Sequence, residues 1–317
     1  MAIIAVDLMS TSLTTAALGK SGKVIIKETV LLENLKGKEI SLLIQKQLKK
    51  ILNEFKNKPI EIKSVGISVP GVYYSKTGNV WAPNIPGWEN YPFRQDMLNF
   101  LIQYGILVKI ASKRTCDILG EMWQGAAKGS KNAIYLSVGN GIGAGVLIDG
   151  KILHGFNDGV GAVGWLALGR SYKEEYKARG CFEHLASGRG IVNRAYELAD
   201  KTKKYSGPLN RKKSPNLTAN DIFEAYKIKD PVATKIIHEG IEHWGMAVAN
   251  MISMFNPEIV IFGGPLFGPA LIFLEDIKAE AKKWASPIFI SKVKFLGSKL
   301  GANAGLFGAG HLAMKKF

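Results

Sequence analysis

Leu136-Ser137-Val138-Gly139-Asn140-Gly141-Ile142-Gly143-Ala144-Gly145 is a glycine-dense turn that joins two short apolar runs. The runs, Ala133 to Val138 and Gly143 to Ile148, have the length and composition of β-strands. The glycines between them supply the backbone freedom that a tight turn requires. We therefore predict a β-hairpin at the start of the second half of the chain.

The N-terminal third predicts a mixed sheet. Three short apolar runs, Ile3 to Asp7, Leu13 to Leu18 and Val24 to Val30, are separated by tight turns and predict an antiparallel meander. A helical pattern over Lys38 to Phe55 and a strand from Ile60 to Val69 follow. Strands that first form a meander and then alternate with helices are typical of an α/β lobe.

The rest of the chain predicts a second α/β lobe. We expect a helix over Thr115 to Gly129 and a long helix over Ala233 to Met254 that stops at Asn256-Pro257. A strand at Ile259 to Phe262, a strand at Ile290 to Phe295 and a final helix at Ala302 to Met314 complete the pattern. The expected domains are an N-terminal lobe, 1–112, completed by the C-terminal helix, 302–317, and a C-terminal lobe, 113–301.

Composition places the chain among soluble globular proteins. It has 317 residues, of which 47% are hydrophobic and 21% charged. The opening decapeptide, MAIIAVDLMS, lacks the features of a signal peptide or a membrane span, so we expect a cytoplasmic protein without membrane contact. The two cysteines, Cys116 and Cys181, lack disulfide and zinc spacing, which predicts buried free thiols.

A formal net charge of +16 raises the question of nucleic-acid binding. Lysine and arginine are scattered along helices with an exposed pattern and bunch only at Arg211-Lys212-Lys213. We interpret the charge as a solvated surface. No helix-turn-helix pattern precedes the first strand, so sequence-specific DNA binding is not expected.

Four segments, in this order and spacing, carry a resemblance to a known family. They are Ile4-Ala5-Val6-Asp7; Ser68-Val69-Pro70-Gly71-Val72 with Ala82-Pro83-Asn84-Ile85-Pro86-Gly87-Trp88; the hairpin stretch 136–145; and Asn256-Pro257-Glu258-Ile259-Val260-Ile261-Phe262-Gly263-Gly264. Together they resemble the ROK family of repressors and sugar kinases across essentially the whole chain. The resemblance implies a two-lobed α/β fold, the actin-like, ribonuclease H-like ATPase architecture.

The position of the catalytic base departs from the family pattern. Phosphoryl transfer to a sugar hydroxyl needs a carboxylate that takes the hydroxyl proton. The resemblance implies an Asn-Asp pair at the start of the helix after the first lobe's last strand, and Ser112-Lys113 stands there. A lysine ammonium offers no acceptor for the proton. Asp117, one turn further on, would replace the base only if the backbone were re-registered.

The sugar-binding signature is also altered. The family's Gly-Glu-x-Gly-His corresponds to Gly161-Ala162-Val163-Gly164-Trp165, so the sugar-gripping carboxylate is lost. Trp165 would either stack on a sugar or another flat ligand or, as we expect, fill the space left by a lost metal site. The resemblance implies sugar contacts at Gly71, Asn84 and Glu183. For Asn84 and Glu183 the alternative is a hydrogen-bonded loop brace.

The family's structural zinc is not expected here. Its ligands are the same histidine and a Cys-x-Cys-Gly-x-x-Gly-Cys run, of which the matching stretch 174–181 keeps only Cys181. One thiolate cannot hold a tetrahedral zinc ion.

The phosphate side is partly retained. Asp7 stands where the family has its metal-organising acid, whereas the glycine turn after it has become Met9-Ser10-Thr11-Ser12. The residues that the resemblance implies at a nucleotide are Asp7, Thr11, Gly139, Gly141, Gly143, Gly263 and Gly264. Glycines also serve hairpins and strand-to-helix turns, which is the alternative reason for their presence. ATP and Mg²⁺ would bind if kinase activity is retained, and no other cofactor is expected.

Three interpretations follow. The first is a non-catalytic or weakened sugar-kinase homologue that binds a sugar or related metabolite in a cleft between the lobes. The second is an ATP-dependent hexose kinase in which Asp117, Asp158 or Glu183 supplies the carboxylate. The third is an assembly or regulatory subunit, based on the homodimers common in the family and on aromatic residues expected to be exposed around Trp88.

Overall fold

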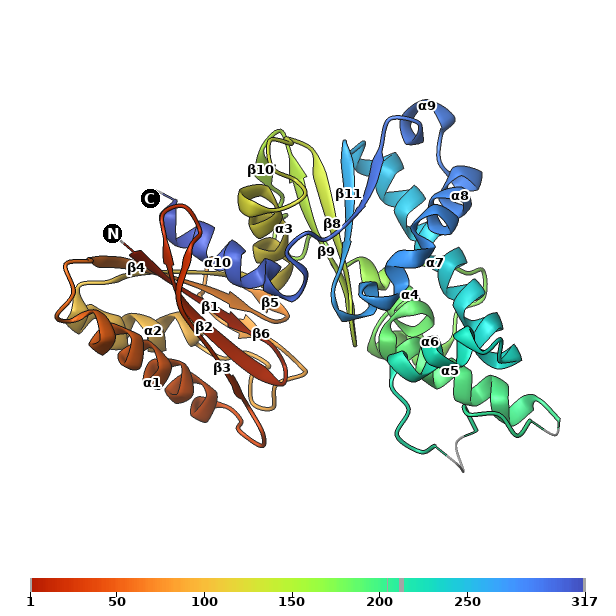
Figure 1. The fold of residues 1–317 in the computed structure, drawn as a ribbon, viewed down its shortest axis with the longest axis horizontal. Helices are drawn as coiled ribbons and strands as arrows, with labels where there is room; N and C mark the ends of the chain where they lie inside the picture. The colour runs from red at the N-terminus through yellow and green to blue at the C-terminus, as the bar shows by residue number, and fades with distance from the viewer. Residues whose placement is uncertain (1, 204, 211–213, 316–317) are drawn as a thin grey trace. The chain divides into compact units, whose positions relative to one another are not determined.

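A computed structural model describes residues 2–203, 205–210 and 214–315, which form two compact units. Unit 1 comprises the described parts of Met1–Gly129, Ile152–Val160 and Asn303–Phe317, and unit 2 comprises those of Ser130–Lys151 and Gly161–Ala302. Both units are α/β structures built around a five-stranded sheet (Figure 1). Arg211-Lys212-Lys213, the predicted basic cluster, lies outside the described residues.

Unit 1 contains the predicted meander and a mixed sheet. Its strands are β1 (Ala2–Leu8), β2 (Ser12–Gly19), β3 (Val24–Leu31), β4 (Ile62–Val69) and β7 (Leu107–Ser112), in the order β3-β2-β1-β4-β7. The pairs β1–β2 and β2–β3 are antiparallel, whereas β1–β4 and β4–β7 are parallel. A short ribbon, β5 (Val72–Tyr73) with β6 (Val80–Trp81), follows β4.

The two faces of this sheet carry different helices (Figure 1). Side chains alternate between the faces of a strand, and in β1 Ile4 and Val6 pack in the cluster that includes α1 (Lys38–Phe55) and α2 (Phe93–Leu101). Ile3 and Ala5 pack on the other face with residues of α3 (Lys113–Gln124) and α10 (Ala304–Met314). The same alternation places Asp7 on the face of α3 and α10.

Helices α3 and α10 pack closely because glycines remove side chains from their contact. A Cβ atom on Gly308 would lie 1.7 Å from the carbonyl oxygen of Cys116, and one on Gly120 would lie 2.2 Å from that of Ala304. Glycine is the residue that permits such a backbone approach. The C-terminal helix is therefore an integral part of unit 1.

Unit 2 confirms the predicted hairpin. Strands β8 (Ala133–Val138) and β9 (Ile142–Ile148) are antiparallel, with Ala133 opposite Leu147. The sheet order is β10-β9-β8-β11-β12, with β10 (Lys151–Ile152), β11 (Ile259–Gly263) and β12 (Lys294–Gly297). Strand β11 is parallel to both β8 and β12.

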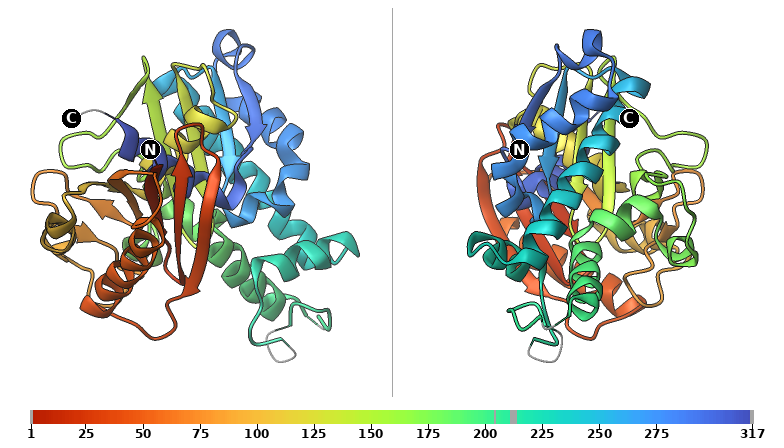
Figure 2. Two further views of the ribbon diagram at one scale, coloured as in Figure 1. Left: turned by 60° about the vertical axis from the view of Figure 1, so that its left-hand side comes forward. Right: turned by 90° about the vertical axis from the view of Figure 1, so that its right-hand side faces the viewer.

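The helices of unit 2 cluster around α7 (Pro231–Phe255), which contacts α4, α5, α6, α8 and α9 (Figure 2). Their bounds are α4 (Cys181–Ala186), α5 (Gly188–Lys201), α6 (Ala219–Lys227), α8 (Leu274–Trp284) and α9 (Pro287–Ile290). Asp230 caps α7 by accepting from the N–H groups of Val232 and Ala233. The helix ends, as predicted, at Asn256, which has a left-handed φ of 43°. None of the helices within the described residues is long and apolar enough to span a bilayer.

The structure differs from the sequence expectations at two places. The sequence places the lobe boundary at residue 112, but α3 and residues 152–160 belong to unit 1. The predicted strand at Ile290–Phe295 is wrong in its first half, because Ile290 ends α9 and a turn precedes the strand. Pro287 stands at the first position of α9, where proline favours a helical start, and the strand begins only at Lys294.

Candidate functional site

Lys113 lies between two buried carboxylates of unit 1. Its ammonium nitrogen is 3.3 Å from Oδ2 of Asp7, on β1, and 2.8 Å from Oδ1 of Asp117, one turn later in α3. The side chains of Asp7 and Asp117 are 3% and 2% exposed, and that of Lys113 is 24% exposed. Asp7 Oδ1 is also buried and has no hydrogen-bond partner among the described residues. The residue that the resemblance matches to the family's base is therefore an ammonium held by two acids.

The electrostatics of this cluster follow from its burial. Burial raises the pKa of Asp117 to about 6, with Lys113 lowering it and the charge of Asp7 raising it further. Burial also raises the pKa of the Cys116 thiol. Both cysteines, Cys116 and Cys181, are buried and free, as predicted. Two carboxyl groups and one ammonium share the site, so the ammonium can compensate the charge of only one carboxylate.

Gly305, in the first turn of α10, completes the cluster. A Cβ atom on this residue would lie 2.4 Å from the ammonium nitrogen of Lys113 and 2.8 Å from each carboxylate oxygen of Asp7. Sequence reasoning missed Gly305, although three glycines within one helix, at 305, 308 and 310, are an unusual pattern that signals close packing.

The alternative carboxylates are engaged elsewhere. Asp117 is 2% exposed and is paired with Lys113 at 2.8 Å. Asp158 Oδ2 accepts hydrogen bonds from both the N–H and the hydroxyl of Ser75, at 2.9 Å each. The carbonyl oxygen of Asp158 accepts at 2.6 Å from Arg114, whose guanidinium pKa is lowered by burial. Sequence reasoning missed Arg114, which braces the loop 152–160.

Glu183 braces the hairpin turn of unit 2. Its Oε2 accepts from the N–H of Ile142 at 2.7 Å, and a Cβ atom on Gly141 would lie 2.9 Å from that oxygen. Burial raises the pKa of Glu183. Its other oxygen, Oε1, makes no hydrogen bond within the described residues. One oxygen thus serves the brace, and the other is available to a ligand.

The predicted nucleotide glycines have local packing reasons to be glycine. A Cβ atom on Gly139 would lie 3.1 Å from Cδ of Pro265. A Cβ atom on Gly263 would lie 2.0 Å from the hydroxyl oxygen of Tyr135. Gly264 has a φ of 86°, and its Cβ atom would lie 2.5 Å from the carbonyl of Val138. These glycines are required by the sheet itself, so they do not by themselves indicate a nucleotide.

Gly143 and the segment after β1 show less constraint. The nearest atom to a Cβ on Gly143 would be 3.7 Å away, which is an ordinary contact. The N–H of Met9 donates to the carbonyl of Ser12 at 2.8 Å, which closes the turn. Thr11 is exposed, and its carbonyl accepts from the N–H of Leu32 at 3.0 Å. The turn at 9–12 contains no residue with a left-handed φ.

The loop at 82–88 presents Asn84 and buries Trp88. Asn84 is exposed, and the loop is closed by a 2.7 Å bond from the N–H of Ala82 to the carbonyl of Trp88. Trp88 is fully buried and donates from Nε1 to the carbonyl of Gly37 at 2.9 Å. Of the aromatic residues around this loop, Trp88 itself is thus buried, whereas Trp81 is 39% exposed. Gly71 has a φ of 72°, and its Cβ atom would lie 2.0 Å from the carbonyl of Trp81.

Tyr176 is the buried aromatic residue of the stretch 174–181, which the resemblance matches to the zinc motif. It lies near Cys181 and contacts His184 with ring centroids 5.2 Å apart. Trp165 is 55% exposed, so the expectation that it fills this space is wrong. It follows Gly164, whose Cβ atom would lie 3.1 Å from the Cβ of Glu183. No group of three His, Cys, Asp or Glu suited to a metal occurs in the described parts of the chain.

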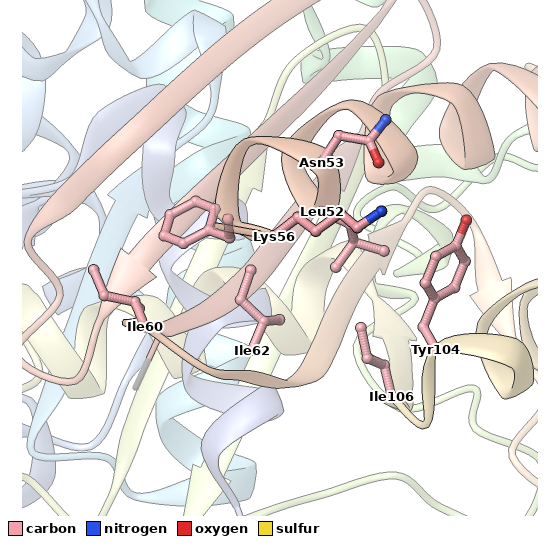
Figure 3. A pocket seen from close by; sticks show the side chains of 8 residues that line it. Leu52, Asn53, Lys56, Ile60, Ile62, Tyr104 and Ile106 are labelled. Atoms are coloured by element: carbon pink, nitrogen blue, oxygen red, sulfur yellow. The ribbon is translucent and has the colours of Figure 1, made fainter. Parts of the chain in front are cut away.

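A hollow of about 300 Å³ on unit 1 is lined by none of the predicted site residues (Figure 3). It lies between the end of α1 and the starts of β4 and β7, with Leu52, Ile62 and Ile106 among its apolar lining and Asn53, Lys56 and Tyr104 among its polar lining.

Comparison with known proteins places the fold in a family. The family model described as the ROK family matches residues 3–316. The chain belongs to the ROK family. This ROK protein is 31% identical to a glucokinase of Thermotoga maritima over 99% of this chain and 98% of that protein. It is also 31% identical to a xylose repressor of Caldicellulosiruptor bescii over 74% of this chain and 57% of that protein.

A solved structure supports the same architecture. A ROK family glucokinase from Streptomyces griseus, in complex with glucose and AMPPNP, aligns with a TM-score of 0.79 and 24% identity over 99% of both chains. This ROK protein thus has the two-lobed actin-like fold of sugar kinases. The relatives it resembles thus include proteins named as glucokinases and a protein named as a xylose repressor.

Proposed function

We propose that this ROK protein binds a sugar or related metabolite without transferring a phosphoryl group to it. The observation that carries the proposal is the position of Lys113, whose ammonium contacts Asp7 and Asp117 where the family has its catalytic carboxylate. An ammonium has no lone pair with which to accept the proton of a sugar hydroxyl. Loss of a general base lowers the rate by about 10²–10⁴.

The phosphate side supports the same proposal. Asp7, the acid that would organise a metal ion in a kinase, is paired with Lys113. The glycine turn after β1 has been replaced, and Met9 and Thr11 lie in a turn closed by the chain's own hydrogen bonds. Oriented backbone N–H groups and a metal ion are the main groups that stabilise the charge of a transferring phosphoryl group. We propose that this chain has lost both, through the replaced glycine turn and the pairing of Asp7 with Lys113.

The sugar side retains groups that suit carbohydrate. Trp165 offers an exposed aromatic face, and Glu183 Oε1 is an acceptor without a partner in the described residues. An aromatic face packs against the apolar side of a pyranose, while a carboxylate oxygen accepts from its hydroxyls. Gly164, which precedes Trp165 in the chain, packs against Glu183. We propose that Trp165 and Glu183 both contact the bound ligand.

A coupled ADP-release assay over a panel of hexoses, N-acetylhexosamines and pentoses tests the absence of transfer. Thermal-shift and fluorescence titrations with the same panel test binding. We expect a sugar-dependent shift without sugar-dependent ADP release, and the shift should weaken in Trp165→Ala. The matched control is Trp284→Ala, since Trp284 is also exposed but lies in α8. Sugar-dependent ADP release would refute the proposal.

A second candidate is an ATP-dependent hexose kinase with a relocated base. The similarity to glucokinases favours it, and Glu183 Oε1 is the carboxylate oxygen that remains available. If this candidate were correct, sugar-dependent ADP release would be present and Glu183→Gln would abolish it.

A further inference from the structure

The ammonium of Lys113 contacts Asp7, the acid that the resemblance to sugar kinases assigns to a divalent cation. A magnesium ion in a kinase site takes about six oxygen ligands at about 2.0–2.1 Å, usually one or two carboxylates with water and phosphate. Here an ammonium nitrogen lies 3.3 Å from Asp7 and 2.8 Å from Asp117. Gly305 closes the cluster, because even a methyl group there would lie 2.4 Å from the ammonium nitrogen. The cluster therefore does not fit a divalent cation.

We propose that Lys113 is a tethered cation that replaces the divalent ion, and that Asp7 and Asp117 form a latent divalent-cation site beneath it. Ligand binding by this protein is accordingly independent of Mg²⁺. Removal of the ammonium would uncover the latent site. The inference concerns the cation alone and goes beyond the proposed function, because it holds whether or not a sugar binds.

The charge balance of the cluster supports this inference. Two carboxylates that are 3% and 2% exposed share one ammonium, so the cluster would hold two uncompensated acids if Lys113 were truncated. Buried uncompensated charge is costly, and it is relieved either by protonation or by a new cation. A divalent ion would balance both acids, whereas the ammonium balances one.

A second observation indicates an acceptor directed at this position. Asp7 Oδ1 is buried and has no hydrogen-bond partner in the described parts of the chain. The same oxygen and its neighbour Oδ2 are equidistant, at 2.8 Å, from the Cβ position of Gly305. The ammonium bonds to Oδ2 of this carboxylate, and Oδ1 is not used. An ion that takes several oxygen ligands could therefore bind Oδ1 in addition.

The cluster is accessible from the side of Lys113. The lysine side chain is 24% exposed, whereas both acids are nearly inaccessible. Replacement of the long side chain by alanine would open a path along the former lysine stem, through which water and an ion can enter. Gly305 leaves room for the ion, because any side chain at this position would occupy the space beside the Asp7 carboxylate.

The experiment compares the wild-type protein, Lys113→Ala and Lys113→Ala/Asp7→Asn, each freed of metal with a chelator. Mn²⁺ binding is measured by electron paramagnetic resonance, and the melting temperature is measured with MnCl₂ or MgCl₂ against NaCl of equal ionic strength. We expect no specific Mn²⁺ binding by the wild type. We expect one saturable Mn²⁺ site and a melting temperature raised by several degrees in Lys113→Ala, with both effects lost when Asp7→Asn is added.

If Lys113→Ala does not fold, Lys113→Gln provides the same test, because its amide keeps a donor for the acids while the positive charge is removed. Mn²⁺ bound by the wild type and lost in Asp7→Asn would overturn the inference. A folded Lys113 variant that binds no Mn²⁺ would overturn it as well.

The outcomes separate this inference from the proposed function. Sugar-dependent ADP release that persists in a chelator would refute the proposed function and leave the tethered cation in place. Specific Mn²⁺ binding by the wild type without any ADP release would overturn only the tethered cation. ADP release that requires Mg²⁺ and Asp7 would overturn both.

Discussion

Replacement of Asp117 by asparagine should change how stability depends on pH. Asp117 is 2% exposed, and its burial raises the carboxyl pKa from an ordinary 3.8 to about 6. Below pH 3.8 the group is protonated in both the folded and the unfolded chain. Between pH 3.8 and about 6 the unfolded chain releases the proton and the folded chain retains it, so the free energy of unfolding falls as the pH rises.

The magnitude follows from the pKa difference. A pKa difference of one corresponds to about 1.4 kcal/mol, so ionised Asp117 costs the folded state about 3 kcal/mol at neutral pH. The amide of the substituted asparagine would stay neutral at every pH. The free energy of unfolding of Asp117→Asn minus that of the wild type should therefore rise by about 3 kcal/mol between pH 4 and pH 7.

Urea unfolding at half-unit steps from pH 4 to pH 7.5 measures this difference. The matched control is Glu89→Gln, because it makes the corresponding acid-to-amide change at an exposed position. A difference for Asp117→Asn that is flat, or that falls as the pH rises, would refute the reasoning. It would mean that the attraction of Lys113 outweighs the burial of the carboxylate.

Three further predictions concern the same elements. Lys113→Met should lower the free energy of unfolding by about 3–5 kcal/mol at pH 7, since it leaves buried acids uncompensated; a loss below about 1 kcal/mol in urea unfolding would contradict this. Gly308→Ala should destabilise the protein by more than about 2 kcal/mol, because its Cβ atom would lie 1.7 Å from the Cys116 carbonyl. The control Gly169→Ala, with nothing within 4 Å of its Cβ position, should be near neutral. Trp165→Ala should change the melting temperature by less than about 2 °C, because the side chain is 55% exposed; a larger loss would show that Trp165 is part of the core.

Local patterns in the sequence were sufficient for most of the fold. The three short apolar runs predict the antiparallel meander of β1, β2 and β3. Asn256-Pro257 marks the end of α7 because asparagine tolerates the left-handed φ of 43°. The strand predicted at Ile290–Phe295 shows where such patterns fail. Pro287 starts a helical turn, but the apolar residues after it have the composition of a strand, and the sequence pattern therefore predicts a strand there.

The candidate site was less predictable, because its contacts join residues far apart in the chain. The position of Lys113 could be assigned from the resemblance, but its pairing with Asp7 depends on how α3 packs on β1. The exposure of Trp165 and the burial of Trp88 depend on which neighbour fills each space. Tyr176 is buried in the stretch that the resemblance matches to the zinc motif, and no pattern of single residues predicts that burial.

Formation of sugar phosphate by excess protein tests the central claim most directly. Protein in excess over radiolabelled ATP, with Mg²⁺ and each sugar of the panel, would detect even a weakened kinase within a single turnover. The account predicts no labelled sugar phosphate above the blank without protein. Labelled sugar phosphate that forms with the wild type and disappears in Asp7→Asn would contradict it.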